Sequence, residues 1–195
     1  MLDRTNYLIK EQVGFLKLTD RYDILAPEDG RQIGFAKEKV GWFIHLLRFV
    51  VSKGLLPTRV EIREREDTPV LLTISRGITF FRSKVQVIDH SGQPVGYFKS
   101  KLFSLGGGFY VFDNNDRQVA EVKGDWKGWN FQMLDGAGKV LGTVTKKWAG
   151  IGRELFTSAD NYMIALSDTT QSNPGVAALL LAAGLAIDIV FKEKE

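Results

Sequence analysis

Apolar and polar residues alternate along most of this chain, in short runs separated by turns rich in Asp and Gly. In the run WNFQM, for example, Trp129, Phe131 and Met133 share one face, and the two residues between them are polar. Alternation with a period of two is typical of strands that bury one face. The pattern therefore predicts a mostly β protein.

A hairpin recurs along the chain as an alternating strand, an Asp/Gly turn and a second strand. Turns that begin at Asp89, Asp113 and Asp135 are 24 and 22 residues apart, which predicts an internal repeat. Asp suits such turns because it hydrogen-bonds its own backbone, and Gly accepts positive φ with little strain. Many short strands at even spacing favour a β-barrel or a β-sandwich. Hairpins are predicted in YDILAPEDGRQIGFAKEK, RVEIREREDTPVLLTISRG, KVQVIDHSGQPVGYFKSK, FYVFDNNDRQVAEVKGDW and WNFQMLDGAGKVLGTVTKKW, and a further strand in DNYMIALSDTT.

Two segments depart from this alternation. Residues 38–54, EKVGWFIHLLRFVVSKG, are predicted to form a helix. The C-terminal run begins with Asn173 as a candidate N-cap and Pro174 at the first helical position. Its apolar stretch up to Asp188 is about a dozen residues long, in the range typical of a buried core helix. Extended to Phe191 the helix would measure about 24 Å, less than a hydrocarbon layer of roughly 30 Å. A core helix over 174–191 is favoured, and insertion into lipid or packing against a partner are the alternatives.

Composition limits the class of protein. The 195 residues are 44% hydrophobic and 25% charged, with a formal net charge of +3. These values predict a single globular domain over residues 1–195. The absence of cysteine excludes disulfides, thiolate metal sites and a cysteine nucleophile. The first residues lack the apolar core of a secretory signal.

The C-terminal third contains an unusual series of residues. LGTVTKKWAGIGRELFTSADNYMIAL, followed by AALLLAAGLAIDIVFKEKE, resembles the phospholipid scramblases. The family carries Gly, Lys, Trp and Gly, then Arg-Glu-x-Phe-Thr-x-Ala-Asp-Asn-aromatic, and finally an apolar helix with Ile-Asp. The matching residues are Gly142, Lys146, Trp148, Gly150, Arg153, Glu154, Phe156, Thr157, Ala159, Asp160, Asn161, Tyr162, Ile187 and Asp188.

This resemblance implies a fold like the C-terminal domain of Tubby, which is shared with the LURP-one-related proteins. In that fold about twelve mainly antiparallel strands close into a barrel around a central hydrophobic C-terminal helix. Eukaryotic scramblases also carry a cysteine-rich, lipid-modified stretch and a proline-rich extension. Neither is found in this sequence, so we expect a minimal, bacterial-type member.

The family also has a proposed calcium segment, which starts Asp-x-Asp-Asn-aromatic and ends in an acidic residue. Mapped here, it makes Asp160, Asn161 and Asp168 calcium candidates, with Ser158 and Thr169 at positions where the family is acidic. Calcium takes six to eight oxygen ligands, so the missing carboxylates predict weak affinity. The alternative is that Asp160 and Asn161 cap a turn before the next strand.

Two short segments combine cationic and aromatic residues in a way that suits lipid headgroups. Arg offers a forked donor to phosphate, and Trp favours the interface. The alternatives are a cover over one end of the barrel for the first segment and a surface turn with a local ion pair for the second. The candidate lipid contacts are Trp42, Phe43, Arg48, Lys146, Lys147, Trp148 and Arg153.

The functional prediction follows from these features. We expect a scramblase-like protein that binds and redistributes membrane phospholipids, with calcium as a modulator and no other cofactor. The alternative is a soluble Tubby-like or LURP-like module that binds a phosphoinositide, another anionic ligand or a protein partner without transport. No motif of a conventional enzyme or of a nucleic-acid-binding protein occurs, so neither class is expected. The expected location is the cytoplasm, with peripheral contact on the inner face of the membrane.

Overall fold

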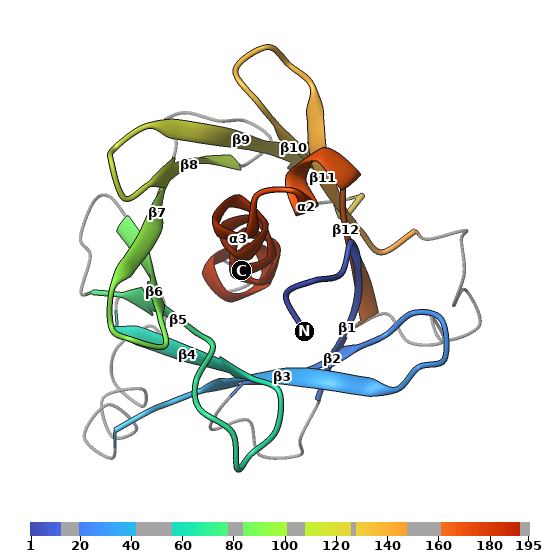
Figure 1. Ribbon diagram of the computed structural model, residues 1–195, viewed down its shortest axis with the longest axis vertical. Helices are drawn as coiled ribbons and strands as arrows, with labels where there is room; N and C mark the ends of the chain where they lie inside the picture. The colour runs from blue at the N-terminus through green and yellow to red at the C-terminus, as the bar shows by residue number, and fades with distance from the viewer. Residues whose placement is uncertain are drawn as a thin grey trace.

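The computed structural model describes residues 1–12, 20–41, 56–77, 84–100, 108–125, 128–147 and 161–191. Within these ranges twelve strands form a closed barrel around a central helix (Figure 1). This confirms the mostly β fold expected from the alternation and the closure expected from the family resemblance. The elements are β1 (Asn6–Glu11), β2 (Arg21–Leu25), β3 (Gln32–Glu38), β4 (Thr58–Arg63), β5 (Leu72–Arg76), β6 (Lys84–Asp89), β7 (Pro94–Ser100), β8 (Gly108–Asp113), β9 (Gln118–Asp125), β10 (Asn130–Leu134), β11 (Val140–Thr145), β12 (Asn161–Leu166), α2 (Asp168–Gln171) and α3 (Pro174–Phe191).

Each strand pairs antiparallel with its neighbours in sequence, and β1 closes the ring by pairing with β12. On β1, Ile9 lies opposite Ile24 of β2 on one side and Tyr162 of β12 on the other. The sequence analysis did not identify β1. Its residues Tyr7, Leu8 and Ile9 are all buried, so the period-two pattern is interrupted where the barrel closes.

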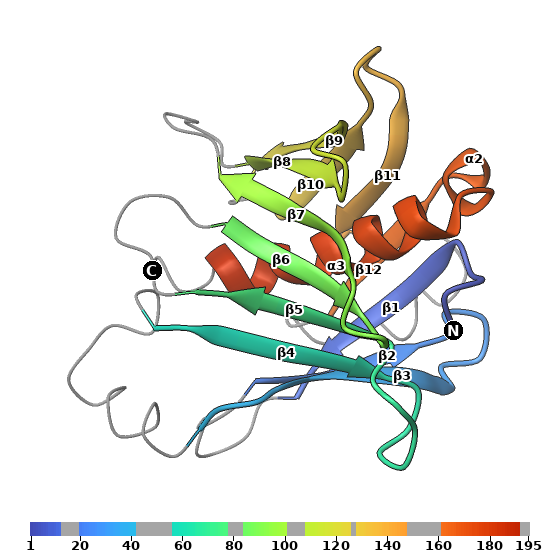
Figure 2. The same ribbon diagram turned by 60° about the vertical axis from the view of Figure 1, so that its left-hand side comes forward.

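The up-and-down order gives the barrel two different ends, which Figure 2 shows from the side. The hairpins that turn after Asp89, Asp113 and Asp135 lie at the end where α3 begins, and we call it the Asx-turn end. At the other end β12 begins and α3 ends, and we call it the Asp188 end. Most residues of the segments that connect strands there lie outside the described residues, namely 13–19, 42–55, 78–83, 101–107, 126–127 and 148–160. The helix predicted for residues 38–54 falls largely in this part of the chain.

The centre of the core is α3, which runs through the barrel (Figure 1). Every residue from Ala177 to Asp188 is buried. Small residues let the helix fit, since a Cβ atom at Gly184 would lie 2.6 Å from Cδ1 of Ile164 on β12. The predicted burial of the C-terminal helix is confirmed.

Both predicted features of the start of α3 are also confirmed. Pro174 is its first residue, and Oδ1 of Asn173 accepts a hydrogen bond from the N–H of Val176 at 3.3 Å. The segment before it differs from the prediction, because the strand DNYMIALSDTT ends at Leu166 and α2 follows. Oγ of Ser167 caps α2 by accepting from the N–H of Thr170 at 3.3 Å.

No helix among the described residues is long and apolar enough to cross a membrane.

The three repeated turns share one geometry at the Asx-turn end. Oδ1 of Asp89 accepts from the backbone N–H groups of Ser91 at 2.8 Å and Gln93 at 2.9 Å. Asp113 and Asp135 accept in the same way from the residues two and four places further on. Each turn also has a residue with positive φ at its fourth position. The internal repeat and its Asp-based turns are thereby confirmed.

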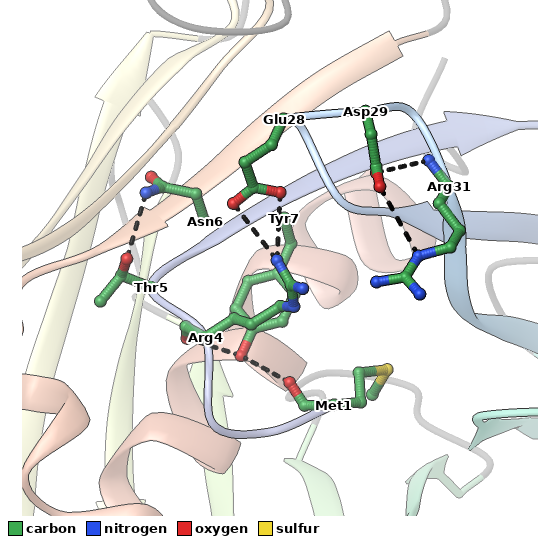
Figure 3. A network of polar contacts seen from close by, with 8 residues as sticks. All are labelled: Met1, Arg4, Thr5, Asn6, Tyr7, Glu28, Asp29 and Arg31. Carbon is green, nitrogen blue, oxygen red and sulfur yellow. Dashed lines mark hydrogen bonds and ion pairs between the residues drawn. The ribbon is translucent and has the colours of Figure 1, made fainter.

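A network around the start of β1 helps to close the same end (Figure 3). The buried hydroxyl of Tyr7 donates to the carbonyl of Arg4 at 2.7 Å, and burial raises the pKa of Tyr7 to about 12. Arg4 pairs with Glu28 of the β2–β3 turn at 3.1 Å. The side-chain amide of Gln171 in α2 donates to the carbonyl of Leu2 at 2.9 Å. Residues far apart in sequence therefore meet beside the first turn of α3.

Candidate functional site

Charged side chains gather inside the barrel at the Asp188 end. Glu11 of β1, Glu38 of β3 and Arg76 of β5 follow inward-facing apolar residues on their strands with the spacing of two. They are 7%, 2% and 4% exposed. Burying charged groups away from water is strongly unfavourable in free energy, so such a cluster marks a candidate functional site.

Asp188, near the end of α3, meets two tyrosines in this cluster. It is 3% exposed, and its carboxylate lies close enough to Tyr22 on β2 and Tyr162 on β12 for its charge to act on both hydroxyls. Burial raises the pKa of Tyr22 and of Tyr162 on β12 well above the usual value, and the negative charge of Asp188 raises both further. Asp188 therefore lies beside two buried hydroxyl groups near the mouth of the barrel.

A pair of tilted aromatic rings links Tyr162 to Lys146, a predicted lipid contact. The Tyr162 hydroxyl is buried, and no hydrogen-bond partner is found for it in the described part of the chain. The ring of Trp129 packs on Tyr162 with centroids 5.3 Å apart. Nζ of Lys146 lies 4.4 Å from the centroid of the Trp129 ring, in a cation–π contact. One face of Trp129 therefore carries positive charge at this end of the barrel.

The described lipid-contact candidates lie together at the Asp188 end. Lys146 and the exposed Lys147 directly follow β11, and the N–H of Lys147 donates to Oγ1 of Thr145 at 3.0 Å. The other candidates lie outside the described residues, although the strands that flank them, β3 with β4 and β11 with β12, end or begin at this same end. These other candidates are Trp42, Phe43, Arg48, Trp148 and Arg153.

The calcium candidates are not brought together. Asn161 is 3% exposed at the start of β12, whereas Asp168 is exposed in α2 at the Asx-turn end. The strand between them is roughly 17 Å long at about 3.3 Å per residue, and calcium ligands lie within about 2.6 Å of the ion. Asn161 and Asp168 cannot bind one ion together. Asp160 lies outside the described residues, and those that are described contain no group of three or more His, Cys, Asp and Glu that could hold a metal ion.

The sequence analysis did not identify the interior charges. A signal was present, since Arg76 continues the inward series of Leu72 and Ile74, and Glu11 continues that of Tyr7 and Ile9. Charged residues at strand ends usually face solvent, so alternation alone did not distinguish them. Closure of the barrel around α3 is what encloses them.

Comparison with known proteins agrees with this architecture. The sequence profile of the Scramblase family matches residues 18–194. Phospholipid scramblase family protein C343.06c of Schizosaccharomyces pombe is 28% identical over 79 residues, which are 39% of this chain and 21% of that protein. The alignment therefore spans about a fifth of the length of the curated relative. No solved structure matches.

The profile match extends from the strands of the first hairpin to the end of α3 and so includes nearly all of the barrel described above. It also contains the C-terminal residues from which the resemblance was first inferred. By this match, the chain belongs to the scramblase family.

Proposed function

We propose that this chain binds phospholipids at a membrane surface, with the Asp188 end of its barrel facing the lipid. The observation that carries the proposal is the position of Lys146 and Lys147. They lie at the Asp188 end. The segments 42–55 and 148–160, which hold the remaining lipid-contact candidates, connect strands at this same end. Cationic side chains near an anionic membrane surface contribute about 1 kcal/mol each. Membership of the scramblase family supports phospholipid as the ligand.

In this proposal α3 stays inside the barrel while the protein binds. Every side chain from Ala177 to Asp188 is buried. Withdrawal of α3 would expose that apolar surface and the inner wall together. Enclosure of the helix favours binding from outside, as in the predicted Tubby-like module, over insertion of the helix.

Redistribution of phospholipid between leaflets is the second candidate function, and family membership favours it. A headgroup that crosses the hydrocarbon layer needs a polar route. The enclosed α3 provides no such route, so lipid transfer would use another surface of the protein or an assembly of several copies. Calcium modulation, a cytoplasmic location and contact with the inner face of the membrane remain predictions.

The test of binding uses a matched pair of lysines. Lys147 and Lys139 are both exposed, the first at the Asp188 end and the second in the β10–β11 turn at the Asx-turn end. We expect Lys147→Ala to weaken binding to vesicles of phosphatidylcholine with phosphatidylserine about fivefold, and Lys139→Ala to leave it unchanged. Flotation with vesicles measures both, at low and high salt. Equal effects of the two variants, or no binding at low salt, would contradict the proposal.

The test of redistribution is a leaflet-exchange assay on the same vesicles with a fluorescent phospholipid. Exchange above the rate of protein-free vesicles supports the second function, and adding calcium or a chelator tests its modulation. If the protein binds and no exchange is seen, binding without transport is the function. Slow amide exchange of α3 on the vesicles would show that the helix remains enclosed.

A further inference from the structure

A pocket of about 200 Å³ opens where β3, β4 and β5 meet the Asp188 end. At about 30 Å³ for each water, it has room for several water molecules or a tetrahedral anion. Its lining comes from the residues that follow β3, the start of β4 and the end of β5. These residues are Lys39, Val40, Gly41, Pro57, Thr58, Arg59, Ser75 and Arg76.

All the charged residues that line this pocket are cationic. Lys39, Arg59 and Arg76 supply positive charge, while Thr58 and Ser75 supply hydroxyl donors. Two other pockets within the described ranges have linings that contain carboxylates as well as cations. In one, Arg21 pairs with Glu66 at 2.8 Å, and in the other Arg117 pairs with Asp113 at 3.0 Å. A lining without carboxylates distinguishes the pocket at the Asp188 end.

The deepest cation of the pocket is held in place. Arg76 is 4% exposed, and its Nη2 donates to Oγ1 of Thr58 at 3.1 Å and to the carbonyl of Leu56 at 3.4 Å. Thr58 and Arg76 are directly opposite each other on β4 and β5. Fixing the guanidinium before a ligand arrives reduces the ordering that binding would otherwise require.

The two outer cations are more accessible. The N–H of Lys39 donates to the carbonyl of Arg59 at 2.8 Å, so the two side chains begin from neighbouring positions at the rim. Nε of Arg59 lies 3.6 Å from one oxygen of Glu61, but the other oxygen of Glu61 is held by Arg63 at 3.0 Å. Because Arg63 already balances Glu61, this carboxylate neutralises Arg59 only weakly. The Arg59 side chain is 60% exposed and can turn toward a ligand.

We infer that this pocket binds a phosphate group, with Arg76 at its base and Lys39 and Arg59 at its rim. Arginine matches phosphate oxygens with its forked donors, and lysine adds a point charge. Among the described residues, a Cβ placed on Gly41 would meet nothing within 4 Å, so there is space for a ligand on that side of the backbone. Three cations match a phosphate monoester, with its charge near −2, better than a zwitterionic diester.

The inference deepens the proposed function and rests on it for the source of the phosphate, which we take to be a phospholipid headgroup. The pocket lies at the end proposed to face the membrane, and the chain passes from Gly41 directly into the segment that holds Trp42 and Phe43. A headgroup in the pocket would therefore reach it from the lipid side. A soluble phosphate ester has the same binding chemistry, and the experiment separates the two.

The test combines a soluble probe with vesicles. Glycerol 3-phosphate is titrated into the protein in chloride buffer while the amide resonances of Gly41 and Ser75 are followed. Binding to vesicles of phosphatidylcholine with phosphatidic acid is measured on the same variants. We expect Lys39→Ala and Arg59→Ala each to weaken both interactions about tenfold. Arg31→Ala, which removes an exposed cation from the β2–β3 turn at the Asx-turn end, should leave both interactions unchanged.

The outcomes test the phosphate site and the identity of its ligand separately. If vesicles bind but neither pocket variant weakens binding and glycerol 3-phosphate shifts no pocket resonance, the phosphate site is overturned while the proposed function stands. If glycerol 3-phosphate binds in the pocket but vesicles do not bind, the headgroup is overturned as the ligand, and so is the proposed function. Lys39 and Arg59 are exposed, so their variants should fold, and unchanged thermal unfolding verifies this.

Discussion

At the Asx-turn end, each of three hairpins is held by one carboxylate that accepts from backbone N–H groups two and four residues further on. At the Asp188 end, the polar groups come from strands at both ends of the sequence and from α3. Tyr22 and Asp188, for example, lie close together although most of the chain separates them in sequence. The first end is built from local contacts that each hairpin can form alone, and the second exists only after the barrel has closed.

This difference bears on where function is placed. Local Asx turns stabilise the fold, and their carboxylates already accept hydrogen bonds from the backbone. They therefore have few polar atoms left to bind a ligand. Interior charges such as Glu38 and Arg76 are unfavourable for folding and are retained where structure or binding requires them. The proposed membrane contacts and the phosphate pocket both lie at the Asp188 end, where these interior charges are found.

The largest expected effect comes from the helix that both ends share. Leu181 of α3 is fully buried, so Leu181→Ala should lower the free energy of unfolding by about 3 kcal/mol through lost packing and a residual cavity. Val140→Ala is the control, because Val140 is 41% exposed and its loss should change stability by less than about 0.5 kcal/mol. Urea unfolding measures both. Similar changes in unfolding free energy for the two variants would show that α3 is not enclosed. The two ends would then not share α3 as a common core.

Removal of the carboxylate at the Asp188 end should have the next largest effect. Asp188→Ala removes a buried carboxylate and leaves the polar groups around it without their partner, so we expect a loss of about 1–3 kcal/mol. Asp188→Asn keeps one oxygen that can accept a hydrogen bond and should lose less. A variant Asp188→Ala as stable as the unchanged protein would mean that this end is not held together by its polar groups.

Alkaline pH should also weaken the Asp188 end. The pKa values of Tyr22 and Tyr162 are raised above the unfolded value of about 10, so the folded state favours the neutral hydroxyls. Their contribution is complete below pH of about 10 and is lost as pH rises toward the folded pKa values, by up to about 1.4 kcal/mol per pH unit for each tyrosine. Tyr7, with a pKa of about 12, acts with the same sign at the other end.

The measurement is urea unfolding across the alkaline range, with Tyr22→Phe as the comparison. The variant lacks one ionising hydroxyl, so its stability should fall less steeply with pH. Equal slopes for the variant and the unchanged protein would contradict the assignment of the alkaline loss to the Asp188 end.

The smallest effect is expected from a single Asx turn. Asp113→Ala removes two hydrogen bonds from backbone N–H groups and an ion pair with the exposed Arg117 side chain, which contributes little. It should lower the free energy of unfolding by about 1 kcal/mol. Hydrogen bonds from the Arg117 and Asn115 backbone outweigh desolvation and lower the pKa of Asp113. Its contribution is therefore present above the usual Asp pKa and is lost as pH falls through the folded pKa.

Thermal unfolding from neutral to acidic pH measures this effect, and Asp113→Asn, which keeps an acceptor, is the control. Phospholipid binding by Asp113→Ala should be unchanged, because the turn lies at the opposite end from the proposed contacts. A loss of binding in a folded Asp113→Ala variant would contradict the division of roles between the two ends.

Features built from local contacts were predicted from the sequence, whereas features at the Asp188 end that depend on distant residues were not. The Asx turns were foreseen because their stabilising contacts span only four residues, and α3 was foreseen because its apolar run exceeds any strand in the chain. β1 was missed because three consecutive buried residues interrupt its alternation. The interior position of Glu11, Glu38 and Arg76 was missed because it depends on partners from distant strands. Lys146 and Lys147 were identified by residue type, but their neighbourhood at the Asp188 end depends on the strand order.

The repeated hairpins, the bounds of α3 and the family can be read from the chain alone, since each is encoded in short-range pattern or in a dense local series of residues. Three features require the folded protein: the enclosure of α3 in a closed barrel, the separation of Asn161 and Asp168 to opposite ends of β12, and the pocket lined by Lys39, Arg59 and Arg76. The physical reason is that alternation reports which residues share a face of a strand, whereas strand order and closure determine which faces and ends meet.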